Sequence, residues 1–259
     1  MLVDEAGNGD PFSSVFTTLA WDGADKVAFF DLHLQRLSEH ASRLRIDLPD
    51  DLKSSVLIAM KNISSIENGK WMPTGLISVR LFKDGKITCE GRVNRQRQPP
   101  LAAVSQVAPR WSKRVTGCKH GNWDAYDAAR KNARSAGADI ALLAHDGAII
   151  DGDRATPILL DGDGEAWIAE QESGGIDSIT SSVIIDGLDQ HGIPVNRGII
   201  NERMLAKARE LIVVGSGIGV ARVEELDEQS IGIGKDAELS KAASQILAKA
   251  LEQSWEGFR

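Results

Sequence analysis

The dipeptide Asp84-Gly85 lies between two runs of strand-forming residues in GLISVRLFKDGKITCEGRV, residues 75–93. Asp-Gly flanked by such runs is typical of a tight hairpin turn, because glycine adopts the left-handed backbone that the turn needs. Similar patterns predict strands on either side of Asp22-Gly23 and of residues 145–147. Because parallel strands need a long crossover, these hairpins argue against an all-parallel, doubly wound sheet.

Helical periodicity alternates with the predicted strands. LHLQRLSEHASRLRI, residues 32–46, repeats leucine at helical spacing and predicts an amphipathic helix that carries Arg36 near its start. Further helices are expected at residues 50–63, from the segment after Lys119 to residue 137, at 178–190, from 202 and from 236. Further strands are expected in DIALLA, AIID, TPILLD, EAWIAE and ELIVVG, and near Val195. The mixture predicts an α/β or α+β fold.

The 259 residues, 42% of them hydrophobic, are enough for one large core or two modest ones. RVNRQRQPPLAAV, residues 92–104, is charged and aperiodic and predicts an interdomain linker. We therefore expect a small N-terminal α/β domain over residues 1–100 and a larger C-terminal domain, with a hairpin-rich sheet, over 101–259. The arginines of this linker, Arg92, Arg95 and Arg97, suit either an anion-binding patch or a solvated charge run.

The formal net charge of −7 argues against binding to nucleic acid or to anionic lipid, both of which need a basic face. Two cysteines, Cys89 and Cys118, predict neither a disulfide framework nor a metal cluster. His33 and His120 lack acid or cysteine partners at ligand spacing, so we expect no metal. The N-terminal residues do not resemble a signal peptide, and we expect a cytoplasmic protein.

Lys119 occupies an unusual setting in TGCKHGNWDAY, residues 116–126. It sits in a short polar turn between Gly117 and Gly121, directly before an alanine-rich helical segment. A surface lysine needs no such surroundings. A lysine held where backbones approach closely is instead suited to act as a nucleophile toward a carbonyl carbon.

Three places suit an anion. In DSITSSV, residues 177–183, hydroxyl side chains crowd a predicted helix start, although ordinary N-capping explains them too. In VVGSGIG, residues 213–219, glycines follow an apolar strand and let backbone N–H groups approach an oxyanion. A dinucleotide fingerprint is not completed there, because Val220 stands where the third glycine is required. Arg36 has the fork geometry that suits phosphate, or is a surface residue of its helix.

Asp151 ends the predicted strand AIID and is followed by Gly152. It is either a turn aspartate or a functional acid that a hairpin returns toward the lysine. A nucleophilic amine, a phosphate-binding set of donors and an acid are together the elements that hold pyridoxal 5′-phosphate.

Several segments resemble one known family in order and spacing: VFTTLAW with HLQRL, KHGN, GADIALL, the IIDG turn, SIT and VVGSGIGVARV. They are similar to the fold-type IV pyridoxal phosphate enzymes, the class IV aminotransferases, and the resemblance covers most of the chain. It implies a two-lobed enzyme with this cofactor, assembled as a homodimer.

The resemblance also implies roles for individual residues. Lys119 would carry the cofactor as a Schiff base, and Arg36 would bind its phosphate. Ile179 and Thr180 match the phosphate contacts at a helix start, and Ser216 matches a threonine of the family. Asp151 stands where the family has a glutamate against the pyridine nitrogen.

Within the family, FTT at residues 16–18 and KHGN at residues 119–122 are most similar to 4-amino-4-deoxychorismate lyase. That branch implies a folate-pathway reaction in which Lys119 removes a proton from the amine-bearing carbon, pyruvate leaves and 4-aminobenzoate forms. The alternatives are an aminotransferase for D- or branched-chain amino acids and a non-catalytic relative. Thr17, Arg80 and Trp123 are the candidates for contact with the small-molecule substrate.

Overall fold

The computed structural model describes residues 9–66, 73–95, 99–232 and 237–259. The first residues of the chain, Arg97 and the expected start of the last helix at Asp236 lie outside these ranges. The fold is mixed α/β, as the hairpins and helical repeats predict. Two compact units make up the chain. The first comprises the described part of Met1–Gln96 with Cys118–Asp124 and Leu251–Arg259, and the second comprises the described part of Arg97–Gly117 with Ala125–Ala250.

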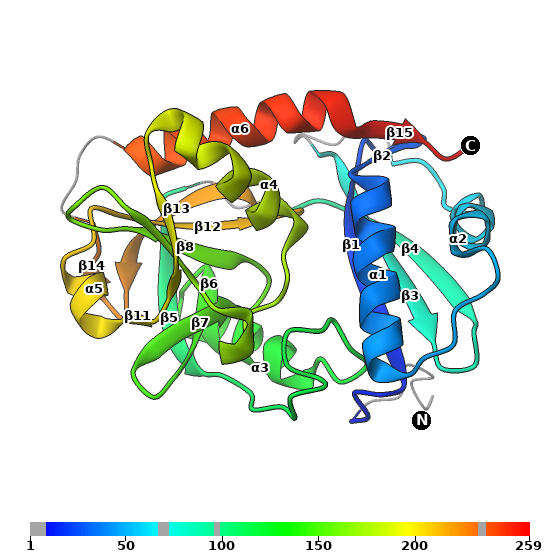
Figure 1. Ribbon diagram of the computed structural model, residues 1–259, viewed down its shortest axis with the longest axis horizontal. Helices are drawn as coiled ribbons and strands as arrows, with labels where there is room; N and C mark the ends of the chain where they lie inside the picture. The colour runs from blue at the N-terminus through cyan, green and yellow to red at the C-terminus, as the bar shows by residue number, and fades with distance from the viewer. Residues whose placement is uncertain (1–8, 67–72, 96–98, 233–236) are drawn as a thin grey trace. The chain divides into compact units, whose positions relative to one another are not determined.

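The first unit is built on a five-stranded antiparallel sheet in the order β15-β2-β1-β3-β4 (Figure 1). Its elements are β1 (Ser14–Trp21), β2 (Lys26–Ala28), α1 (Phe30–Leu44), α2 (Leu52–Met60), β3 (Gly75–Phe82), β4 (Ile87–Val93) and β15 (Trp255–Gly257). The β3–β4 hairpin turns at Gly85, whose φ of 81° fits the expected glycine turn. The apolar face of α1 packs on β1, and α2 packs on β4.

The second unit contains a ten-stranded sheet, in which β10-β9-β8-β12-β13-β5-β6-β7-β11 are adjacent in this order and β14 pairs with β13. The strands are β5 (Leu101–Val107), β6 (Ile140–His145), β7 (Ala148–Gly152), β8 (Thr156–Leu160), β9 (Ala166–Ala169), β10 (Val195–Gly198), β11 (Ile200–Asn201), β12 (Glu210–Gly215), β13 (Gly219–Leu226) and β14 (Gln229–Ser230). Parallel pairing occurs at β5–β6, β5–β13 and β9–β10, and the other pairs are antiparallel. Isoleucine, leucine, valine and alanine of this sheet form the core.

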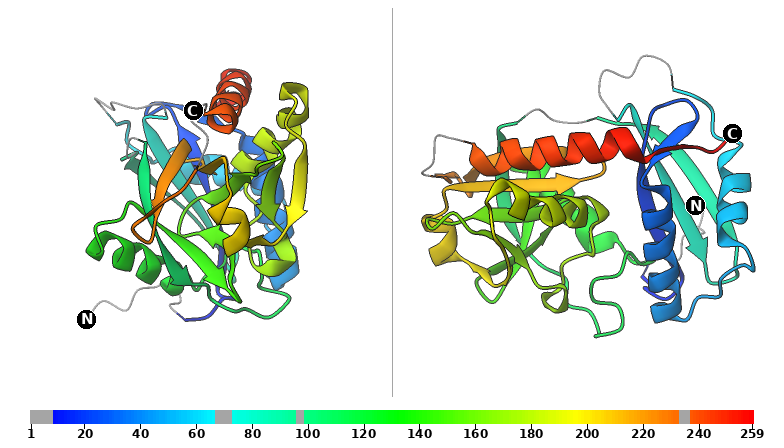
Figure 2. Two further views of the ribbon diagram at one scale, coloured as in Figure 1. Left: turned by 90° about the vertical axis from the view of Figure 1, so that its left-hand side faces the viewer. Right: turned by 45° about the horizontal axis from the view of Figure 1, so that its top comes forward.

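The remaining helices lie at the expected positions, except for the short η1, which the sequence did not predict. They are α3 (Asp124–Ser135), η1 (Gln171–Ser173), α4 (Ile179–Leu188), η2 (Asp189–His191), α5 (Glu202–Ala206) and α6 (Glu238–Ser254), the last of which is a single long helix in the right-hand view of Figure 2. Each helix of the described residues is too short or too polar to cross a membrane.

Two expectations about local structure need correction. The segment RVNRQRQPPLAAV is not irregular throughout, since Arg92 and Val93 end β4 and residues 101–104 begin β5. Ladder hydrogen bonds to β3, β6 and β13 override its weak periodicity. The strand expected after Asp22-Gly23, in DKVAFFD (residues 25–31), stops at Ala28, because Phe29 takes a left-handed φ of 55° and α1 begins at Phe30.

The segment Cys118–Asp124 follows the expected domain boundary at residue 100 but belongs to the first unit. Its backbone pairs with β1, because the edge of that strand near Val15 is not covered by β2, which meets β1 at Trp21. Lys119 is thereby placed in the first unit.

Candidate active site

The lysine turn, residues 117–122, depends on its two glycines. Gly117 has a φ of 80°, in the left-handed region that residues with a side chain rarely adopt. A Cβ atom at Gly121 would lie 2.6 Å from the carbonyl oxygen of Asp10 and closer still to Oγ of Ser13. The chain therefore reverses in close backbone contact with the segment that leads into β1.

Both backbone polar groups of Lys119 are held within the first unit. Its carbonyl oxygen accepts a hydrogen bond from the N–H of Phe16 at 3.1 Å. Its own N–H donates to Nδ1 of His40, on α1, at 3.2 Å. The lysine backbone is thus fixed on one side by β1 and on the other by α1.

The amine of Lys119 lies against two aromatic rings. Nζ is 5.0 Å from the centre of the Phe16 ring and 4.8 Å from that of Trp123, and these rings meet edge to face at 4.9 Å. The guanidinium of Arg80, which pairs with Phe16 across the β1–β3 ladder, is 4.9 Å from the same phenyl ring. Aromatic faces attract cations, so the rings hold the amine in a defined place.

Arg36 is buried, with 4% of its surface exposed, and donates from Nη2 to Oγ1 of Thr17 at 2.7 Å. Oγ1 of Thr17 also lies 2.7 Å from Nδ1 of His33. A guanidinium can only donate, so the threonine hydroxyl accepts from Arg36, and the direction of its hydrogen bond to His33 depends on the tautomer of that ring. The Thr17 side chain, a candidate for substrate contact, is therefore used to orient Arg36.

Three buried histidines near these cations are held neutral. Burial is the largest cause, and nearby positive charge adds to it. The pKa of His33 is lowered well below its usual value, that of His40 is lowered to about 3 and that of His120 to about 4. Arg36 and Lys119 act on both His33 and His40, whereas Lys119 acts on His120. The positive charge of this region is consequently that of lysine and arginine.

In the second unit, the carboxylate of Asp151 is buried at the end of β7. Oδ1 accepts from the N–H of Gly152 at 2.9 Å and Oδ2 from the N–H of Ile176 at 3.0 Å. A Cβ atom at Gly175 would lie 2.8 Å from the Ile150 carbonyl oxygen, so glycine is needed for this close approach. Burial, with the charge of Asp151 as a further cause, raises the pKa of the neighbouring Tyr126.

The expected anion-binding positions of the second unit lie at element ends. Ile179 and Thr180 open α4, whose N-cap Ser178 accepts from the N–H of Ser181 at 3.3 Å. The first N–H groups of a helix have no partner inside it, and the positive end of the helix dipole lies there. Ser216 is half-buried in the turn that joins β12 to β13, between Gly215 and Gly219.

Of the predicted site residues, Lys119 and Arg36 lie in the first unit and Asp151, Ile179, Thr180 and Ser216 lie in the second. The sequence interpretation missed His40. Its signal was available: His33, Arg36 and His40 repeat at intervals of three and four within the apolar stripe of α1, where polar residues are unexpected.

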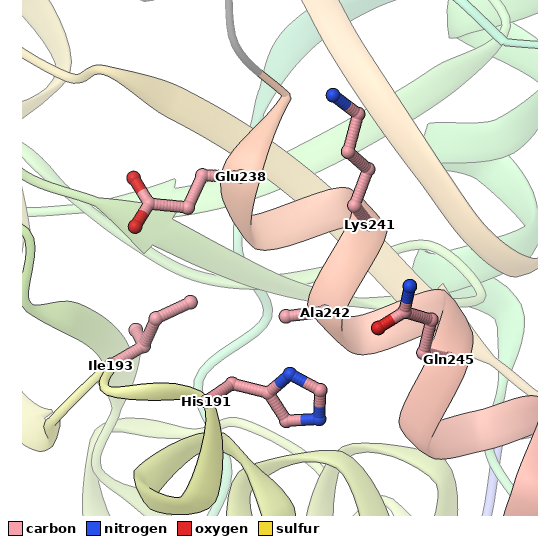
Figure 3. Close-up of a pocket in the computed structure, with 6 residues that line it drawn as sticks. All are labelled: His191, Ile193, Glu238, Lys241, Ala242 and Gln245. Atoms are coloured by element: carbon pink, nitrogen blue, oxygen red, sulfur yellow. The ribbon is translucent and has the colours of Figure 1, made fainter.

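A separate open depression lies in the second unit, and Figure 3 shows the side chains around it. None of the predicted site residues lines it. Its lining residues are His191, Ile193, Glu238, Lys241, Ala242 and Gln245. Among the residues that the structure describes, no group of histidine, cysteine and acidic side chains is arranged to hold a metal ion.

Solved structures share this fold. The branched-chain aminotransferase of Thermoproteus uzoniensis, with norvaline, has a TM-score of 0.79 at 16% identity, covering 96% of this chain and 91% of the other. A Legionella pneumophila protein provisionally identified as 4-amino-4-deoxychorismate lyase has a TM-score of 0.76 at 18% identity, covering 92% and 91%. The branched-chain amino acid aminotransferase of Escherichia coli has a TM-score of 0.78 at 17% identity, covering 100% and 93%.

At these low sequence identities, the similarity to the solved structures shows the fold alone. No curated protein matches the sequence. Residues 14–226, however, match the family described as amino-transferase class IV, from the first strand of the lysine-bearing unit to the end of β13. That match takes in more than half of the chain and all six predicted site residues, and the protein therefore belongs to the class IV aminotransferase family.

Proposed function

We propose that this protein is a pyridoxal phosphate-dependent lyase that converts 4-amino-4-deoxychorismate into 4-aminobenzoate and pyruvate. Enzymes of the class IV aminotransferase family use this cofactor. The observation that carries the cofactor part of the proposal is the setting of Lys119, whose backbone is held by β1 and α1 and whose amine lies against two aromatic rings. The choice of a lyase rests on the similarity of residues 16–18 and 119–122 to that branch of the family. A lysine fixed in this way suits a covalent link to an aldehyde.

The available donors fit the cofactor. A buried guanidinium, the N-terminus of a ten-residue helix and a glycine-flanked hydroxyl are groups that bind phosphate. A buried carboxylate held by two N–H groups suits a protonated pyridine nitrogen. When bound, pyridoxal phosphate supplies an aldehyde that links to amines and a ring that withdraws electrons from the substrate carbon.

We assign the roles accordingly. Lys119 provides the linking amine and later takes a proton on Nζ from the amine-bearing carbon of the substrate. Arg36, Ile179, Thr180 and Ser216 hold the phosphate, and Asp151 faces the ring nitrogen. Asp151 has one methylene fewer than the glutamate expected from the family resemblance. The loop that presents the Ile176 N–H fixes the direction of this shorter carboxylate.

Covalent labelling tests the role of Lys119. Purified protein incubated with pyridoxal phosphate and reduced with borohydride should carry the cofactor on the peptide that contains Lys119, as measured by mass spectrometry. Lys119→Ala should lose this label and all turnover, because no other group supplies the amine. Lys131→Ala, on the exposed face of α3, is the matched control and should behave as wild type. A wild-type protein that takes no label would refute the cofactor assignment.

The reaction type is tested by its products. A lyase forms pyruvate and 4-aminobenzoate from 4-amino-4-deoxychorismate without an added keto acid. The alternative activity in this family is transamination of D- or branched-chain amino acids, which needs a keto acid and leaves the cofactor aminated. Product chromatography with and without keto acid separates the two. Transamination without any 4-aminobenzoate would overturn the lyase proposal and leave the cofactor role of Lys119 intact.

We also propose that the protein works as a homodimer, since the resemblance of the chain to fold-type IV enzymes implies this assembly. Light scattering of the cofactor-loaded protein at micromolar concentration should give twice the mass of one chain. A monomeric mass with full turnover would contradict it.

A further inference from the structure

The buried face of α1 contains an imidazole that the proposed roles do not use. His40 is 5% exposed and lies among Leu37, Ala41 and Leu44 on the apolar face of the helix. Burying a polar ring is unfavourable unless it finds a hydrogen-bond partner. The partner of Nδ1 is the backbone N–H of Lys119, 79 residues further along the chain.

The position of Lys119 explains why this partner is required. Its carbonyl oxygen already pairs with the Phe16 N–H, and the next residue, His120, forms an antiparallel bridge with Val15. The lysine N–H donates to His40, so both the N–H and the carbonyl group of Lys119 have hydrogen-bond partners. With both groups held, the Cα–Cβ bond of Lys119 has one direction relative to β1.

The hydrogen bond also defines the state of the ring. Nδ1 can accept from an N–H only when it carries no proton, so His40 is the neutral tautomer with its proton on Nε2. Burial, and then the charges of Arg36, Lys119 and Arg43 and the neighbouring His120, lower the pKa of His40 to about 3. The acceptor is therefore present throughout the usual working range of pH.

We infer that His40 is the positioning residue of the reactive lysine: its Nδ1 holds the Lys119 backbone so that Nζ is presented for covalent chemistry. The inference rests on the proposed function, because it gives His40 a role only if Lys119 is the linking residue. It adds a residue on α1, which also carries Arg36 one turn earlier, so one helix would orient both cationic groups.

Three variants distinguish the contribution of the acceptor atom from the contribution of the size of the ring. In His40→Asn the amide oxygen can take the place of Nδ1, whereas in His40→Gln it takes the place of Nε2. His40→Leu keeps apolar bulk without an acceptor. If His40→Leu fails to fold, the Asn and Gln variants still compare two polar amides that differ in where the acceptor lies.

The first measurement is amide hydrogen exchange at Lys119 in the full-length protein before cofactor is added. Exchange should be about tenfold faster in His40→Gln and His40→Leu than in wild type, the factor expected for one hydrogen bond, and unchanged in His40→Asn. The second measurement is the rate at which pyridoxal phosphate with borohydride labels Lys119. It should fall about tenfold in the same two variants, recover in His40→Asn and leave labelling of the exposed Lys131 unchanged.

Equal labelling rates in wild type, His40→Gln and His40→Leu would overturn the role of His40. So would an Asn variant as slow as the Leu variant, because ring shape and not the acceptor would then matter. The proposed function fails differently: wild-type protein would take no label on Lys119 at any rate, whatever the exchange data.

Discussion

Gly121 admits no larger side chain in the lysine turn, because an added methyl group would lie 2.6 Å from the Asp10 carbonyl oxygen. Gly121→Ala should therefore displace the turn, destabilise the protein by roughly 1–3 kcal/mol and abolish labelling of Lys119. Urea denaturation and borohydride trapping measure the two effects. Gly162→Ala is the matched control: no heavy atom lies within 4 Å of its added methyl, and both changes restrict the unfolded chain equally. Normal labelling in Gly121→Ala would show that the turn tolerates movement.

At Asp151, the two carboxylate oxygens face two backbone N–H donors. Asp151→Asn removes the charge and turns an NH₂ group toward one of these donors, so turnover should fall at least about tenfold while the cofactor remains bound. Asp151→Glu keeps the charge and should retain more activity than the Asn variant. Steady-state kinetics and cofactor absorbance check this. Equal turnover of the Asn variant and wild type would remove Asp151 from the reaction.

Among the elements of the second unit, α6 has its N-terminus capped by a side chain of the sheet. The carboxylate of Glu210, at the start of β12, accepts from the N–H groups of Leu239 at 2.8 Å and Ser240 at 3.2 Å. Glu210→Ala leaves these donors without their acceptor and should lower the free energy of unfolding by roughly 1–3 kcal/mol.

Chemical denaturation measures this loss, and Glu210→Gln, which keeps one acceptor oxygen, should lose less. Glu225→Ala, at an exposed position of β13, is the control and should remain within about 0.5 kcal/mol of wild type. Equal stabilities of Glu210→Ala and Glu225→Ala would mean that water replaces the cap at no cost.

The elements differ in how well the sequence predicts them. The β3–β4 hairpin and α1 are predictable, since Asp84-Gly85 and the leucine repeat are local signals. β5 and β13 are not, because their residues alternate weakly and become strands through partners far along the chain. The same limit applies to the site. Lys119 stands out by its glycines, whereas the His40 contact joins residues 79 positions apart and no local pattern contains it.

For the whole molecule, stability should fall as pH drops from about 6.5 toward 5. His33, His40 and His120 are kept neutral in the fold by lowered pKa values, whereas in the unfolded chain they titrate near 6.5. In this window the unfolded state binds more protons, and each histidine lowers the free energy of unfolding by up to about 1.4 kcal/mol per pH unit. The buried Asp153 acts in the opposite direction. Its pKa is raised in the fold, so the folded state binds a proton there before the unfolded state does, and this stabilises the fold as the pH falls.

Urea denaturation at pH 7, 6 and 5 measures this dependence. His40→Asn lacks one titrating group, so its decline should be shallower than that of wild type. Unfolding free energies that do not change between pH 7 and 5 would contradict the prediction.

The strand β15 closes the edge of the first unit by pairing Trp255, Glu256 and Gly257 with β2, although the rest of that sheet lies before residue 94 (Figure 1). A ribosome makes the chain in one direction, so β2 emerges long before its partner, and the second unit is synthesised in between. The β2 edge of the N-terminal sheet is therefore unpaired during most of translation. A nascent chain arrested before residue 255 would expose β2 to chaperones or to other unpaired strands. That exposure ends when residues 255–257 are synthesised and pair with β2.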